Sequence, residues 1–189
     1  MTHWQETLEL WAPAWAAIRE PGGAATEQVL AWPVASGGVW APVVHLVTED
    51  AAAARHFAAT ASWAETGAAI LLSAATDDLD LVPRLPPDTN LAQVPLDDYD
   101  AVEVAVFDRP VAGGRVKVGD GLAVLGGLHV DLEDPAMVVA LEAVMLASLG
   151  EEAFLHGADT LYLVAGSAQA ARVAPLGWGQ VAQILSFTR

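Results

Sequence analysis

Residues 122–157 read LAVLGGLHVDLEDPAMVVALEAVMLASLGEEAFLHG, and this stretch decides the fold. Its first part, residues 122–132, alternates well enough between apolar residues and small or polar ones to predict a β-strand. Leu128, Val130 and Leu132 share one face of that strand, so the pattern predicts a strand with one side turned to a core.

A long helix is expected to follow this strand directly. Asp134 suits the N-cap, and Pro135 suits the first helical position, where its missing N–H costs nothing. From residue 136 to residue 149 the only polar side chains are Glu142 and Ser148. Such a wide apolar surface predicts a helix that is buried on more than one side.

Further strands and a short helix surround this unit. Strands are expected at residues 102–107, 115–118, 160–165 and 181–187. Gly113 and Gly114 predict a turn before the second of them, and Ser167 begins the short helix. The chain therefore predicts an α/β fold of mixed α and β elements.

This order of elements resembles the second half of the GNAT superfamily of N-acetyltransferases. The segments LHVDLE at residues 128–133 and APLGW at residues 174–178 resemble two segments of that family. The resemblance implies a central mixed sheet flanked by helices. It also implies transfer of an acetyl group from acetyl-CoA to an amine.

The resemblance also implies a cofactor site. The exposed backbone of Leu128 to Val130 would bind the pantetheine arm, helped by a bulge at Gly126 and Gly127. The family's pyrophosphate loop would fall on residues that include Val139 and Leu141. Ser167 takes the place of a frequent asparagine.

Several residues depart from the family pattern at this site. Val139 and Leu141 stand where small residues let backbone N–H groups approach the pyrophosphate, and Asp134 adds a negative charge there. Val173 replaces a tyrosine that donates a proton. No lysine or arginine occurs at residues 119–171, so these departures predict weakened acetyl-CoA binding.

Catalytic candidates are few. His129 is expected to share a strand face with Asp131 and Glu133, and either His129 or Glu133 would serve as the base that deprotonates an amine. The alternative is a sheet-face histidine that is hydrogen-bonded to a carboxylate. The histidines are scattered and the aspartates lack a calcium-loop spacing, so no metal site is predicted.

Composition narrows the partners and the location. The chain has 189 residues, a net charge of −16 and a pI near 4.3, which argues against nucleic acid and anionic membranes as partners. It has no cysteine, and its first residues do not form a secretory signal, which fits a cytoplasmic protein. The uncharged residues 28–48 predict a β-hairpin around a Ser-Gly-Gly turn rather than a membrane span.

Two subdomains are expected. Residues 1–92 predict a helix over residues 4–18 with a tryptophan stripe, the hairpin, an alanine-rich helix over residues 50–66, and a strand over residues 68–74. This order resembles an N-terminal partial GNAT-like extension. Residues 93–189 would form the GNAT-like core.

Three functions stay open at this point. The first is a non-catalytic interaction or regulatory module that has lost effective acetyl-CoA binding. The second is an active N-acetyltransferase with an atypical cofactor site, and the third is a small-molecule binding module with tryptophans around an apolar cleft. A protein or amine partner is expected, as is a homodimer through the final strand or the tryptophan-rich helix.

Overall fold

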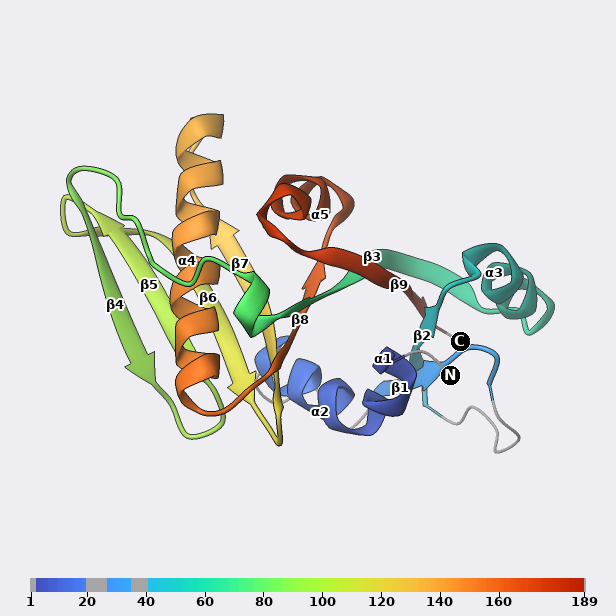
Figure 1. Ribbon diagram of the computed structural model, residues 1–189. Coiled ribbons are helices and arrows are strands. Elements are labelled where there is room, and N and C mark those ends of the chain that lie inside the picture. Colours follow the sequence, from blue (N-terminus) through green and yellow to red (C-terminus); the bar gives the residue numbers. More distant parts are fainter. Residues whose placement is uncertain (1–2, 20–26, 35–40, 189) are drawn as a thin grey trace.

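The computed structural model describes residues 3–19, 27–34 and 41–188. Within these residues, nine strands form one mixed sheet in the order β1-β2-β9-β3-β8-β7-β6-β5-β4 (Figure 1). The strands are β1 Glu27–Ala31, β2 Val43–Thr48, β3 Ala64–Ala75, β4 Thr89–Pro95, β5 Asp100–Val106, β6 Arg109–Val118, β7 Leu122–Val130, β8 Thr160–Ala165 and β9 Gly179–Thr188. The helices are α1 His3–Glu6, α2 Leu8–Arg19, α3 Ala51–Thr60, α4 Pro135–Leu155 and α5 Ser167–Val173, with 3₁₀ turns η2 Thr76–Asp78 and η3 Ala174–Leu176. The predicted mixed sheet flanked by helices is confirmed.

Helices cover both faces of the sheet around β7. Ala123 and Leu125 belong to the apolar cluster that contains the buried side of α4. Leu122 and Val124, which point the other way, belong to the cluster that contains the buried side of α2. The middle of β7 is therefore covered on both faces.

Helix α4 has the N-terminal end and the burial that its sequence predicts. The side chain of Asp134 accepts a hydrogen bond from the N–H of Ala136, and Pro135 follows as the first helical residue. Gly157, with φ of +82°, lies just past the C-terminal end. The segment between η2 and β4 crosses the outer side of α4, where Leu81 packs so closely on Gly150 that a Cβ there would lie 2.6 Å from it (Figure 1). No helix among the described residues has the length and apolar character that a bilayer crossing requires.

Strands from the two expected subdomains alternate within one sheet. β3, from the N-terminal part, lies between β8 and β9 and pairs antiparallel with both. The expected division between residues 92 and 93 falls inside β4. The two-subdomain organisation stays a prediction, and the sheet itself is continuous across it.

The expected hairpin in residues 28–48 is wrong, because β1 and β2 pair in parallel. Apolar patterning reports which side chains are buried and cannot distinguish the direction of pairing. The antiparallel partner of β2 is β9, at the far end of the chain. The expected Ser-Gly-Gly turn lies outside the described residues.

Three smaller expectations also need correction. The first helix is divided at Thr7, whose hydroxyl lies 2.8 Å from that of Tyr162. The alanine-rich helix ends at Thr60, and its last expected residues belong to β3. Gly113 and Gly114 lie within β6, and the β5–β6 turn is made by Phe107 and Asp108, which both have positive φ.

The two surfaces expected to form a homodimer are interior. The final strand, β9, lies between β2 and β3 rather than at an edge. Trp4, Trp11 and Trp15 of the tryptophan stripe are all buried in the core between the sheet and α2. A homodimer remains a prediction.

The free energy of unfolding is expected to depend on pH because one histidine is buried. His45 of β2 is 6% exposed; its Nδ1 lies 2.8 Å from the hydroxyl of Ser186 and its Nε2 lies 3.1 Å from the guanidinium of Arg19. Burial, and then the charge of Arg19, lowers the pKa of His45 to about 4. The unfolded chain therefore binds an extra proton between pH 6.5 and pH 4, so stability is present above this window and is lost as pH falls through it.

We expect His45 to reduce the free energy of unfolding by about 2 kcal/mol between pH 7.5 and pH 5. Urea denaturation of the wild type and of His45→Gln at both pH values isolates this contribution, because the many carboxylates titrate alike in both proteins. An identical pH dependence in the two proteins would contradict the assignment.

Candidate functional site

The central feature of the site is the divergence of β7 from β8. The two strands pair in parallel only from Leu122 to Leu125 on β7. A bulge then follows, in which the β6–β7 register shifts and Gly127 takes a φ of +63°. Beyond it, Leu128 and Val130 keep β6 as a neighbour, while no described strand pairs with them on the β8 side. The expected bulge is present.

At the N-terminal end of α4, backbone N–H groups donate hydrogen bonds to the capping residue Asp134. The N–H of Ala136 donates to Oδ1 of Asp134 at 3.0 Å, and the N–H of Val138 donates to the carbonyl oxygen of Asp134 at the same distance. An exposed carboxylate thus accepts one of the few backbone donors that a helix end offers. Its charge disfavours a second anion there.

The other expected cofactor residues are dispersed around α4 and α5. Val139 is 46% exposed on the surface of α4, whereas Leu141 is fully buried in the core. Ser167 is the exposed first residue of α5, and the N-cap residue is Gly166. Val173 is buried at the other end of α5. Of the two expected cofactor residues on α4, only Val139 therefore presents its side chain to solvent.

An ion pair joins α4 to α5. Both carboxylate oxygens of Glu142 accept hydrogen bonds from Arg172, at 2.7 and 2.6 Å, and Gln169 donates a third at 3.2 Å. The side chain of Glu142 is 7% exposed and that of Arg172 is 35% exposed. The hydrogen bonds to Glu142 hold the pKa of Arg172 above its ordinary value. The two helices that flank the diverging strands are thus joined by an ion pair whose carboxylate is largely buried.

The candidate base lies on the opposite face of the sheet. His129 is exposed, its Nδ1 lies 3.2 Å from the carbonyl oxygen of Gly127, and its ring packs on Gly113. A hollow of about 330 Å³ over β5, β6 and β7 is lined by His129 together with Glu103 and Asp131. Glu133 lies beyond the end of β7 and is not among the residues that line the hollow. The structure brings His129 and Asp131 together and leaves Glu133 out.

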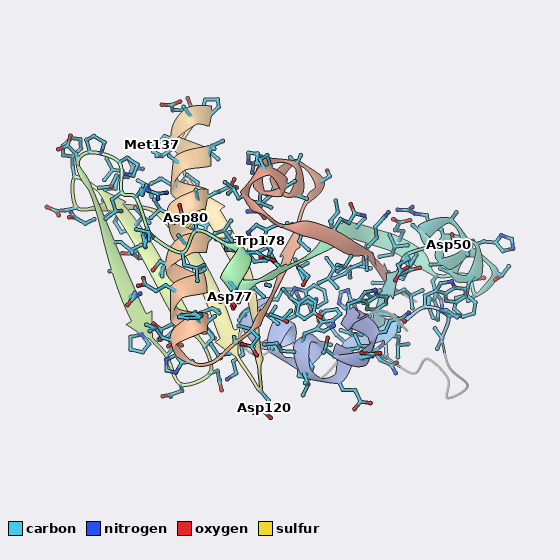
Figure 2. The ribbon with its side chains drawn as sticks, in the orientation of Figure 1. Asp50, Asp77, Asp80, Asp120, Met137 and Trp178 are labelled. Atoms are coloured by element: carbon cyan, nitrogen blue, oxygen red, sulfur yellow. The ribbon has the colours of Figure 1, made fainter. Side chains whose placement is uncertain are left out.

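A larger hollow of about 610 Å³ lies between the outer side of α4, the segment after η2, and the corner after η3. Trp178 and Asp80 are on its lining (Figure 2). Trp4, Trp11 and Trp15 are core residues, so of the tryptophans in the expected stripe none faces such a cleft. Among the described residues no group of three histidine or acidic side chains is placed to hold a metal ion.

Comparison with known proteins supports the fold. Neither a family model nor a curated protein matches the chain. The chain is similar to a solved GCN5-related N-acetyltransferase from Kribbella flavida, with 19% identity and a TM-score of 0.60 over 77% of this chain and 67% of the other. It is also similar to a tandem GNAT protein from the clavulanic acid biosynthesis pathway, with 14% identity and a TM-score of 0.59 over 79% of this chain and 64% of the other.

A third similar structure is a GCN5-related N-acetyltransferase from Sphaerobacter thermophilus, with 9% identity and a TM-score of 0.57 over 78% of this chain and 59% of that chain. This chain thus spans roughly three fifths to two thirds of these structures. It has the fold of the GCN5-related N-acetyltransferases, as the sequence resemblance implied.

Sequence reasoning missed the role of Glu142. The signal was present, because Glu142 is an isolated carboxylate in an otherwise apolar helix, and a buried carboxylate needs a partner. Arg172 is the first lysine or arginine after Glu142 along the chain, so it was a candidate partner. The pairing itself depends on how α5 returns towards α4, which no local pattern encodes.

Proposed function

We propose that this GNAT-fold protein has weakened or lost acetyl-CoA binding and acts as a non-catalytic interaction or regulatory module. The Glu142–Arg172 pair is the observation that carries the proposal. Arg172 is the one basic residue of the described α4 and α5, and it donates two hydrogen bonds to Glu142. No unpaired cation of either helix is therefore available to a polyphosphate.

The N-terminal end of α4 supports the same proposal. A pyrophosphate needs exposed backbone N–H groups at a helix N-terminus that carries no competing charge. Asp134 supplies such a charge and accepts a bond from the N–H of Ala136. The residues present at α4 and α5 do not fit the pyrophosphate of acetyl-CoA.

Calorimetric titration with acetyl-CoA tests the proposal. We expect no measurable heat, and no thermal stabilisation, at ligand concentrations up to about 1 mM. The matched variant is Asp134→Ser with Glu142→Gln, which keeps a capping residue, removes both charges and releases Arg172. Tighter binding by the variant than by the wild type would support the electrostatic reason.

Micromolar binding by the wild-type protein would overturn the proposal. If neither the wild type nor the variant binds acetyl-CoA, the proposed loss of binding stands, but these two carboxylates are not its cause. Folding of both proteins is checked by their thermal midpoints in the absence of ligand.

A working N-acetyltransferase is the second candidate, and the divergence of β7 from β8 favours it. The backbone of Leu128 to Val130 lacks a strand partner on that side among the described residues. His129 would then take the proton from the acceptor amine in the hollow it shares with Glu103 and Asp131. Acetylation of any member of an amine panel by the wild type, lost in His129→Ala, would select this candidate.

A cytoplasmic location and a protein or amine partner complete the proposal. The absence of cysteine from the chain is compatible with a reducing compartment. The net charge of −16 favours a cationic partner over nucleic acid or an anionic membrane.

A further inference from the structure

Strand β4 forms one edge of the sheet and pairs only with β5 among the described strands. The two strands run antiparallel along all of β4 without a register shift. Just beyond its two ends, the N–H of Leu96 donates to the carbonyl oxygen of Tyr99, and the N–H of Phe107 donates to that of Asp88. Both bonds join residues that lie directly opposite each other, and both involve an even-numbered residue on the β4 side. In an antiparallel pair such bonded positions alternate along the strand, so the even-numbered residues of β4 bond to β5. The odd-numbered residues of β4 direct their backbone N–H and C=O groups away from β5.

The outward positions of β4 are Thr89, Leu91, Gln93 and Pro95. Pro95 has no N–H and occupies an outward position, where the β5 ladder requires none. The strand TNLAQVP contains no charged residue, although charges commonly protect the edges of sheets from further pairing. The backbone of β4 is therefore open to an added strand.

The surroundings of this edge select the partner. Asp88 precedes the strand, Asp97 and Asp98 follow it, and Val94 and Leu96 are 42% and 47% exposed. A second copy that paired through its own β4 would bring acidic ends together in either orientation. An extended segment with an apolar centre and basic ends would match both the charges and the exposed apolar side chains.

A hollow beside the strand has room for one side chain of such a segment. Its volume is about 130 Å³, and it lies between the end of β4 and the C-terminal half of α4. Gln93 and Leu149 contribute to its walls, and so do the acidic residues Asp100 and Glu152. Strand addition derives its affinity from backbone bonds and its specificity from pockets for alternate side chains. This hollow suits the stem and charge of a lysine or arginine.

We propose that the β4 edge binds an extended peptide segment with basic ends, by addition of a tenth strand to the sheet. The inference rests on the proposed role as an interaction module and names the chemistry of its partner. The edge is three strands away from β7, so failure at this surface leaves the acetyl-CoA titration unaffected.

The test uses arrayed synthetic peptides of about seven residues, with random apolar and threonine centres and either lysine or glutamate at both ends. Lysine-ended peptides are expected to bind the full chain at least roughly tenfold more tightly than their glutamate-ended counterparts. The bound peptide is expected to slow hydrogen exchange at the amides of Thr89, Leu91 and Gln93.

Two variants at one position give a matched comparison. Gln93→Pro removes an outward N–H without breaking a bond to β5, and Gln93→Ala removes the side chain but keeps that N–H. Both lose the 3.2 Å hydrogen bond from Gln93 to Ser148, so this loss does not distinguish them. Peptide binding is expected to fall about tenfold or more in the proline variant and to persist in the alanine variant.

Three results would overturn the proposal. These are equal binding of lysine-ended and glutamate-ended peptides, unchanged binding by Gln93→Pro, and no slowing of exchange at the three outward amides. A wild-type dimer that dissociates in Gln93→Pro would assign the edge to a second copy instead. The exchange measurement needs only the wild-type protein, so the proposal stays testable even if Gln93→Pro does not fold.

Discussion

Replacement of Trp11 by alanine is expected to lower the free energy of unfolding by about 4 kcal/mol, the usual cost of emptying a large aromatic site in a core. Trp11 is fully buried beneath the sheet, where its ring centroid lies 5.9 Å from that of Tyr162. Its Nε1 donates to the carbonyl oxygen of Trp4 at 3.0 Å. The substitution therefore leaves a cavity and an acceptor without its donor.

Thermal and urea denaturation measure this effect, with Leu10→Ala as the control. Leu10 is the neighbouring residue of the same helix and is 49% exposed, so its truncation should cost less than about 0.5 kcal/mol. If both variants lose similar amounts, the tryptophan stripe is not part of the core. It would then be available to a partner, as the binding interpretation of the stripe requires.

Replacement of Arg172 by alanine is expected to cost about 2 kcal/mol, below the full penalty for breaking a buried pair, because Arg172 is partly exposed. The loss arises mainly at Glu142, which stays largely buried with only the 3.2 Å bond from Gln169. Urea denaturation at pH 7 measures it. Adding Glu142→Gln to the Arg172→Ala variant is expected to restore part of the stability, because it removes the uncompensated charge.

A surface pair of the same geometry provides the comparison. Arg55 donates two hydrogen bonds of 2.9 Å to Glu65, where both side chains are about a third exposed or more. Replacement of Arg55 by alanine should change stability much less than replacement of Arg172, because water solvates the remaining carboxylate. Equal losses at the two sites would show that desolvation of Glu142 is unimportant.

The sequence predicted the central unit well because its signals are local. The capping residue, the proline after it and the apolar helix lie within a short stretch, and each acts through its immediate neighbours. Gly126 and Gly127 also predicted the bulge. The bulge changes which residues of β7 face α4, and the alternation of apolar residues alone does not show this change. Before it, Ala123 and Leu125 face α4, and after it Leu128 and Val130 do, so the inserted residue exchanges the two faces.

The errors concern contacts between distant segments. The β1–β2 pair was expected to be a hairpin around a Ser-Gly-Gly turn, yet β2 takes its antiparallel partner from the end of the chain. The final strand was expected to offer an exposed surface for a dimer, yet β9 lies between β2 and β3. At the site, the positions of Leu128, Val139 and Ser167 followed from element order. The Glu142–Arg172 pair required the packing of α5 on α4, which element order does not contain.

The position of β9 has a consequence for synthesis of the chain. β2 and β3 both take β9 as a partner, so neither can complete its pairing until the last described residues have left the ribosome. Pairings of such large sequence separation form slowly, because the intervening chain must be ordered first. The N-terminal strands therefore remain open to wrong pairing during translation, and a cut between the two halves would not release two independent folding units.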